Sequence, residues 1–280
     1  MPAVMDGGKK LCVLHGNCQG ETLAAFLAAS PEFTAAFEVE YYVNFTRQAI
    51  PEASLARCGL LLHQHLGPEW GDLASDALKQ KLPPGAQSLC FPNMLFKGTW
   101  PFWSNREGFD YAADTQLDGL LTRGLDKTEI LFVALRGELD RMYGLSSLLK
   151  ETLRREREKE AFSQVKYVDI IEADFRGEKL FASVNHPGKR LMLHAADSVL
   201  ALLGMPPLPE AFRQACPELY QDFQLPIHPR VAAHHGLAFG GWGEKYNVYG
   251  QPLTYPEYIS LYLDCKLAGR KDFINFLTQG

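Results

Sequence analysis

The residue best suited to chemistry in this chain is Cys18, in the sequence GNCQG at residues 16–20. A cysteine can act as a nucleophile, and backbone N–H groups beside it can form an oxyanion hole. His65 and His186 are candidate bases. Together with amide side chains at Asn17, Gln19 and elsewhere, this set of groups suits acyl transfer better than redox or phosphoryl chemistry.

The residues around Cys18 have the pattern of a strand, a tight turn and a helix. Residues 11–14 are apolar and of strand length, and apolar side chains recur at helical spacing over residues 23–27. This places Cys18 at the carboxyl end of a strand and the amides of residues 17–20 at a helix N-terminus, which favours anions and lowers the pKa of a thiol. Gly16 and Gly20 allow a sharp turn and close approach to a ligand. The alternative is a small buried cysteine in an ordinary strand-to-helix turn.

Three further strands are predicted at residues 37–43, 59–65 and 88–93, with a helical pattern at 73–82. Strands that alternate with helices indicate an α/β fold with a short, mostly parallel sheet, and ligands collect at the carboxyl ends of such strands. Polar side chains stand at three of these ends: Asn17 to Gln19, His63 to His65, and Asn93. This convergence is the strongest physical argument for a site.

The rest of the chain is mainly helical. We expect a single domain over residues 1–280, with an α/β part at about 10–95 and a helical part at about 110–280. The aromatic segment 96–109 is either a loop packed over the sheet edge or a wall that stacks on a sugar or nucleobase. Residues 150–160 mix both charges on a helical pattern, which indicates a solvated face rather than a nucleic-acid site.

A late strand is predicted at residues 179–184, followed by Asn185-His186-Pro187 and a strongly apolar helix. Asn185 or His186 would cap this helix, with Pro187 in its first turn. Lys189 and Arg190 also fall in the first turn, where the helix dipole disfavours cations. A bound phosphate would offset that penalty.

Composition excludes several classes of protein. A net charge of −5 gives no general reason to bind nucleic acid, and no apolar run is long enough to span a bilayer. The N-terminus lacks the apolar core of a signal peptide, and the six cysteines form no CxxC pair, so we expect a cytoplasmic protein. No Walker loop, GxGxxG or GxSxG is present. The histidine pairs at 63 and 65 and at 234 and 235 lack partners at metal-site spacing, so no metal is expected.

Four motifs occur in a fixed order: GNCQG after a strand, Gln64 at a strand end, Phe91-Pro-Asn93 before an aromatic segment, and Asn185-His-Pro187 before an apolar helix. Together they resemble the WcbI-type polysaccharide biosynthesis proteins, a family of expected acetyltransferases in bacterial capsule pathways. The resemblance covers about residues 10–205. It implies a largely helical fold around a small sheet, binding of coenzyme A or acetyl-CoA as a substrate, and acetylation of a carbohydrate hydroxyl.

The resemblance implies that Cys18, Gln19, Gln64, Asn93 and His186 belong to the site, and the other candidates follow from the residues themselves. Cys18, Gln19 and His186 become the catalytic candidates. The expected coenzyme A contacts are Gly16, Asn17, Gln64, Asn93, Arg106, Asn185, Lys189 and Arg190. Among the last group, Arg106, Lys189 and Arg190 are the candidates for the phosphates, because an acidic protein must hold them through local cations.

Two routes fit these residues. Cys18 could accept the acyl group in a ping-pong mechanism, or His186 could deprotonate the sugar hydroxyl while Cys18 and Gln19 line the oxyanion site. Two other classes remain open: an SGNH-like esterase with cysteine in place of serine, and a non-catalytic module that binds a glycan or nucleotide.

Overall fold

The computed structural model describes residues 8–105 and 113–279. The chain forms two compact units, and neither is one continuous piece of sequence. The sheet unit comprises the described residues of Met1–Asn93 with Arg157–Asp169 and Lys189–Pro217. The helical unit comprises the described residues of Met94–Glu156, Ile170–Gly188 and Glu218–Gly280. Segments at 157–169 and 189–217 therefore belong with the sheet, and the single domain stays a prediction.

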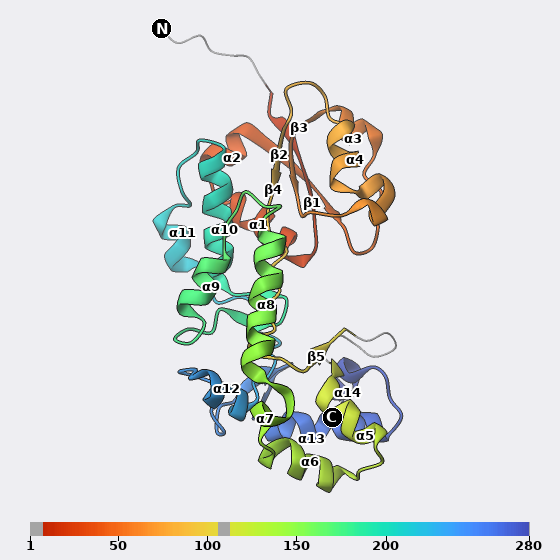
Figure 1. Ribbon diagram of the computed structural model, residues 1–280. Helices are drawn as coiled ribbons and strands as arrows, with labels where there is room; N and C mark the ends of the chain where they lie inside the picture. Colours follow the sequence, from red (N-terminus) through yellow and green to blue (C-terminus); the bar gives the residue numbers. More distant parts are fainter. Residues whose placement is uncertain (1–7, 106–112, 280) are drawn as a thin grey trace. The chain divides into compact units, whose positions relative to one another are not determined.

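The sheet unit contains a four-stranded parallel sheet in the order β2-β1-β3-β4 (Figure 1). Its strands are β1 Lys10–Gly16, β2 Phe37–Val43, β3 Cys58–His63 and β4 Gln87–Cys90. The predicted α/β fold with a parallel sheet is confirmed. β3 and β4 end earlier than the predicted residues 65 and 93. The side chains of Gln64 and Asn93, which follow these two strands, both hydrogen-bond Asn17.

Helices cover both faces of this sheet, as expected for parallel strands. Leu11 and Val13 of β1 pack with Leu55 and Leu78 on one face. Figure 1 shows α3 and α4 on that side and α1, α2 and α10 on the other. The helical elements of this unit are α1 Cys18–Leu27, α2 Pro31–Ala36, α3 Glu52–Ala56, the 3-10 helix Pro68–Leu73, α4 Ser75–Gln80, α10 Lys189–Leu202 and α11 Glu210–Ala215. Two more, α8 Leu145–Glu160 and α9 Val168–Asp174, contribute residues to both units.

The helical unit surrounds a core that includes Phe102, Leu139, Leu145 and Val231. Its helices are α5 Thr115–Thr122, α6 Lys127–Arg136, α7 Leu139–Tyr143, α12 Pro229–His235, α13 Tyr255–Leu267 and α14 Phe273–Gln279. Three short antiparallel pairs join them: β5 Trp103–Ser104 with β6 Ala113–Asp114, β7 Phe181–Ser183 with β8 His186–Pro187, and β9 Tyr246–Val248 with β10 Gln251–Leu253.

The prediction that Asn185 or His186 caps the apolar helix is wrong. His186 and Pro187 form β8, which pairs with β7, and the Gly188 N–H donates to Leu180 O at 2.7 Å. The chain thus completes a small hairpin before α10 begins at Lys189. Lys189 and Arg190 do lie in the first turn of α10, as expected.

The charged stretch on α8 mostly forms the solvated face that its sequence indicates. Glu151 accepts hydrogen bonds from Arg154 at 2.8 Å and Arg155 at 2.6 Å. Two of its acids are buried, however: Glu156 accepts from a backbone N–H at 3.0 Å, and Glu160 from another at 2.8 Å. Among the described helices, none combines the length and apolar character needed to cross a membrane.

Candidate active site

The turn between β1 and α1 holds Cys18 as the first residue of the helix. Asn17 is the N-cap: its backbone is extended, and its Oδ1 accepts a hydrogen bond from the Gln19 N–H at 3.0 Å. Such a cap stabilises a helix by about 1 kcal/mol. Cys18 is half-buried, and the other five cysteines are buried, so Cys18 is the most accessible thiol of the six. The predicted strand, turn and helix are confirmed at this position.

Gln64, directly after β3, fixes this turn from the neighbouring strand. It is only 1% exposed, and its side-chain oxygen and nitrogen each make two hydrogen bonds. Its Oε1 accepts from the Asn17 N–H at 2.9 Å and from Asn44 Nδ2 at 3.1 Å. Its Nε2 donates to Asn17 Oδ1 at 2.9 Å and to Pro92 O at 3.3 Å. Gln64 therefore connects the ends of all four strands.

Asn93 extends this cluster on the β4 side. Its Oδ1 accepts from Asn17 Nδ2 at 3.1 Å, and its backbone carbonyl accepts from Lys159 Nζ at 2.9 Å. The structure thus brings together Asn17, Gln64 and Asn93, whose positions at strand ends pointed to a common site. Carboxyl ends of parallel strands share one edge, so this outcome follows from the strand directions alone.

Three residues of the cluster were missed by sequence reasoning. Asn44 directly follows the predicted strand 37–43, so its position was a usable signal. Tyr41 donates its hydroxyl to Asn17 O at 2.7 Å. Lys159 lies in the charged stretch that indicated a solvated face, and no sequence pattern connects it to Asn93.

The expected lowering of the Cys18 pKa is wrong. Burial raises the pKa of this thiol, and the negative charge of Glu21 raises it further; the N–H groups of Gln19 and Cys18 only partly counter this. Burial disfavours the thiolate because a charge loses solvation in a low-dielectric site. Cys18 is therefore a protonated thiol at neutral pH.

Most of the backbone amides expected to form an oxyanion hole already have acceptors. The Asn17 N–H binds Gln64, the Gln19 N–H binds the Asn17 side chain, and the Gly20 N–H binds Asn17 O at 2.7 Å. The Cys18 N–H, together with that of Gln19, hydrogen-bonds the Cys18 sulfur. The Gln19 side chain is 1% exposed, so it lies inside the protein rather than on an open surface.

The two glycines of this turn serve internal packing. Neither has a positive φ. A Cβ on Gly16 would lie 2.8 Å from Phe91 Cζ, and one on Gly20 would lie 2.9 Å from Leu14 Cδ2. The close approach predicted for a ligand is thus made by side chains of the protein itself, and a ligand contact of Gly16 stays a prediction.

The histidines around Gln64 have separate roles. His63 is buried, and its Nδ1 lies 3.2 Å from both Ser75 Oγ and Gln64 O, so it supports the turn after β3. Burial lowers its pKa to about 4. His65 is exposed and stacks on Phe162 with ring centroids 4.0 Å apart. Within residues 8–105 and 113–279, no group of three or more His, Cys, Asp or Glu side chains could hold a metal ion.

Asn185 and His186 belong to the helical unit, whereas Cys18 belongs to the sheet unit. His186 Nδ1 lies 2.7 Å from Ser183 Oγ, and its ring stacks on Tyr220 with centroids 4.4 Å apart. Burial lowers the pKa of His186 to about 4, so the imidazole is neutral at neutral pH.

The candidate phosphate ligands differ in their surroundings. Lys189 Nζ donates to Cys216 O, so this amine is engaged inside the sheet unit. Arg190 is exposed in the first turn of α10. Arg106 lies outside the described residues.

These features define an α/β protein with a cysteine-centred site at the carboxyl edge of a parallel sheet. A family model described as polysaccharide biosynthesis enzyme WcbI matches residues 11–208, and the chain belongs to this family. A solved structure matches with a TM-score of 0.71 and 18% identity, over 97% of this chain and 91% of that one. That protein is described as WcbI, a novel polysaccharide biosynthesis enzyme, in a native form without a disulfide bond between coenzyme A and a cysteine. At this identity the likeness shows the fold. Among curated proteins, no match is found.

Proposed function

We propose that this protein is a coenzyme A-dependent acyltransferase that moves an acetyl group to a carbohydrate hydroxyl in bacterial capsular polysaccharide biosynthesis. The observation that carries the proposal is the hydrogen-bonded cluster of Asn17, Gln64 and Asn93, which fixes the turn that presents Cys18. The solved WcbI structure supports coenzyme A as the substrate, because its description names coenzyme A together with a cysteine. The cytoplasmic location stays a prediction.

The raised pKa of Cys18 favours direct transfer over a covalent acyl-enzyme. A protonated thiol is a weak nucleophile and needs a base before it can attack a thioester. In the direct route, a base removes the proton of the sugar hydroxyl, the oxygen attacks the thioester carbonyl, and the coenzyme A thiolate leaves and takes up a proton. Cys18 and Gln19 would then line the site of the developing oxyanion.

His186 has the properties of such a base. The Ser183 hydroxyl donates to Asn185 Oδ1 at 3.4 Å, so its oxygen accepts the proton on His186 Nδ1. In this arrangement Nε2 carries the lone pair that accepts a proton. The low pKa keeps the ring neutral near neutral pH, although it also makes the imidazole a weaker base than one with an ordinary pKa. Asn185 therefore acts by orienting His186, through Ser183.

The phosphates of coenzyme A require local cations. Arg190 is the stronger candidate on α10, since guanidinium groups bind phosphate through two parallel hydrogen bonds. Arg106 is the second candidate. Loss of one such contact should weaken binding by roughly 1.5–3 kcal/mol. Calorimetric titration of coenzyme A into Arg190→Ala, Arg106→Ala and the double variant measures this directly.

Acetyl-CoA and intact-protein mass spectrometry distinguish the two routes. We expect no stable acetyl adduct on the parent, residual transfer in Cys18→Ala, and loss of transfer in His186→Gln. An adduct that disappears in Cys18→Ala would instead establish the ping-pong route. If coenzyme A causes no thermal shift at millimolar concentration, the acyltransferase proposal fails.

Ester hydrolysis without coenzyme A is the second candidate. It is favoured by the position of Cys18 after the first strand of the sheet, where SGNH-like esterases carry serine. Hydrolysis of an acetyl ester by the parent but not by Cys18→Ala, without a coenzyme A thermal shift, would support this activity. A glycan- or nucleotide-binding module would bind its ligand equally well after substitution of Cys18 and His186.

A further inference from the structure

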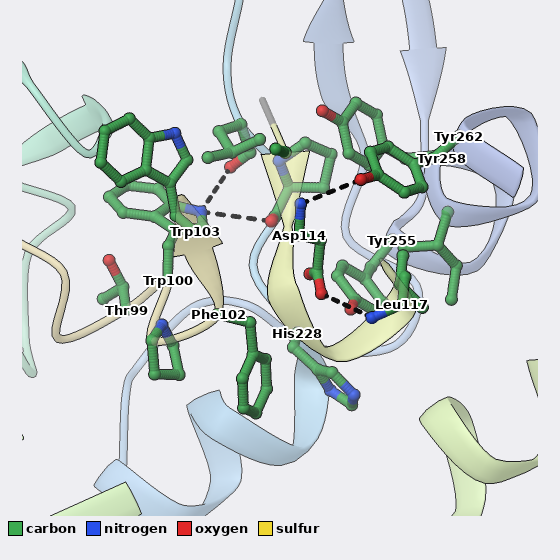
Figure 2. A pocket seen from close by; sticks show the side chains of 15 residues that line it. Thr99, Trp100, Phe102, Trp103, Asp114, Leu117, His228, Tyr255, Tyr258 and Tyr262 are labelled. Atoms are coloured by element: carbon green, nitrogen blue, oxygen red, sulfur yellow. Dashed lines mark hydrogen bonds between the residues drawn. The ribbon is translucent and has the colours of Figure 1, made fainter. Parts of the chain in front are cut away.

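A pocket inside the helical unit is lined largely by aromatic side chains (Figure 2). Trp100 and Trp103 come from the segment that includes β5, and three tyrosines, Tyr255, Tyr258 and Tyr262, come from α13. The pocket encloses about 440 Å³ of empty space, part of it open to solvent. The part of this space that the centre of a water molecule can occupy is about 40 Å³, room for a few waters, so a larger ligand requires the side chains around it to move.

Three polar atoms around this pocket are buried without a hydrogen-bond partner in the described part of the chain. They are Thr99 Oγ1, Trp103 Nε1 and the Tyr255 hydroxyl. Thr99 and Tyr255 are each only 5% exposed. Folded proteins leave few such groups unpaired, because each costs the solvation it has lost. Three around one pocket indicate a ligand that supplies the missing partners.

Two other polar groups of the same pocket, the Trp100 indole N–H and the Tyr262 hydroxyl, are hydrogen-bonded and hold its walls. Trp100 Nε1 donates to Leu225 O at 3.1 Å and to Pro226 O at 3.2 Å (Figure 2). The Tyr262 hydroxyl accepts from the Asp114 N–H at 3.1 Å and donates to Asp118 at 2.7 Å. The unpaired groups are therefore not the result of a loosely packed wall.

The charge of the pocket favours a neutral ligand. Asp114 Oδ1 accepts from the N–H groups of Gln116 and Leu117, as the N-cap of α5. Burial raises the pKa of the Asp114 carboxyl to about 6. No lysine or arginine lines the described wall, and the Asp114 carboxylate would repel a phosphate.

We propose that this pocket binds one neutral sugar ring of the acceptor carbohydrate, an assignment that rests on the proposed function. The C–H face of a pyranose packs on indole and phenol rings, which are large apolar surfaces. Its hydroxyl groups both donate and accept, so they can satisfy the indole N–H and the two hydroxyls at once. Thr99 and Trp103 come from the aromatic segment, for which the sequence leaves open a packed loop or a wall that stacks on a sugar or nucleobase.

The test is calorimetric titration of the full chain with the methyl glycosides of glucose, galactose and mannose. Adenosine is titrated in parallel to test whether the pocket binds a nucleobase. We expect saturable binding of at least one glycoside. Tyr255→Phe and Trp103→Phe should each weaken it roughly three- to tenfold, the effect of one neutral hydrogen bond. Trp242→Phe is the matched control, because Trp242 is 47% exposed and lies outside the pocket.

The Tyr255 hydroxyl has no hydrogen-bond partner in the described part of the chain, so its removal in Tyr255→Phe should not lower the melting temperature, and weaker binding cannot be attributed to unfolding. If no glycoside binds, or if Tyr255→Phe binds it as tightly as the parent, the proposal is overturned. Adenosine binding that Tyr255→Phe weakens would assign the pocket to a nucleobase instead. Coenzyme A titrated into the same proteins keeps the two proposals apart. If coenzyme A binds but no glycoside does, only the sugar site is refuted. If a glycoside binds but coenzyme A does not, only the acyltransferase proposal is refuted.

Discussion

The side chain of Gln64 binds Asn17 through two hydrogen bonds, one accepted from the Asn17 backbone N–H and one donated to Asn17 Oδ1, both at 2.9 Å. Asn17 in turn caps the helix that begins at Cys18. A residue at the end of β3 therefore determines the conformation of the turn after β1. The accessible thiol is held by side-chain amides from neighbouring strands, and not by the glycines beside it.

Gln64→Leu should destabilise the protein and weaken coenzyme A binding. The substitution leaves the Asn17 N–H and the Asn44 amide without their acceptor, and each buried unpaired group costs about 1–3 kcal/mol. Urea denaturation measures the stability, and calorimetry the binding. Gln80→Leu on the exposed end of α4 is the control and should change neither. Equal stability of Gln64→Leu and the parent would show that the cluster does not hold the turn.

Alkylation of Cys18 by iodoacetamide should be slow at neutral pH and should accelerate as the pH rises above the ordinary pKa of a thiol. The reason is that only the thiolate reacts, and burial raises the pKa of Cys18. Peptide mass spectrometry follows the rate at this residue, since the other five cysteines are buried. A rate that is already maximal near pH 7 would mean that the thiol is activated, and would return the ping-pong route to first place.

Gly16→Ala should destabilise the native state by roughly 1–3 kcal/mol, the usual effect of an extra methyl group in a packed site. Its Cβ would meet Phe91 Cζ at 2.8 Å. The double variant with Phe91→Leu should recover part of the loss, because the shorter side chain makes room. Gly119→Ala in α5 is the control: nothing lies within 4 Å of its Cβ, so it should be neutral or stabilising by up to about 1 kcal/mol. If the stability losses of Gly16→Ala and Phe91→Leu simply add in the double variant, the clash with Phe91 is ruled out.

Stability should fall as the pH is lowered from about 6.5 to about 4. Burial lowers the pKa of both His15 and His63 to about 4, from an ordinary value of 6.5. Between these values the unfolded chain binds protons that the native protein does not, so the free energy of unfolding decreases by about 1.4 kcal/mol per pH unit for each group.

The His15→Leu variant tests this pH dependence most directly. His15 is fully buried, and both of its ring nitrogens lack a partner among the described residues. Urea unfolding at a series of pH values should show a slope smaller by about one proton in this variant, whereas Gln80→Leu, at an exposed position without a titratable group, should keep the parent slope. An unchanged slope in His15→Leu would mean that His15 is protonated in the folded protein.

Lys159→Met should weaken coenzyme A binding, because it removes a cation and the donor to Asn93 O at the edge that carries Asn17. Because this lysine is half-buried, we expect the substitution to weaken the free energy of coenzyme A binding by about 1 kcal/mol. Lys159→Arg keeps the positive charge and should lose less. Lys150→Met, on the exposed face of the same helix, is the control. If both methionine variants bind coenzyme A alike, Lys159 has no role at this site.

The strands of the sheet and the place of its polar edge could be predicted from the sequence. Apolar runs of strand length alternate with helical patterns, and this periodicity requires a parallel sheet whose carboxyl ends meet. The positions of Asn17, Gln64 and Asn93 at three strand ends were therefore readable from local pattern. Asn44, at the fourth end, carried the same signal and was overlooked.

The protonation state of Cys18 and the hydrogen-bond partners of the site residues depend on tertiary packing and could not be predicted from the sequence. The helix N-terminus predicted a low pKa for Cys18, but burial is a property of the packed protein and outweighs the dipole. The hairpin at His186 depends on pairing with β7, which no local cap signal reveals. Lys159 reaches Asn93 across 66 residues of chain. Contacts between residues so distant in sequence exist only once the chain has folded, because they depend on which surfaces pack together.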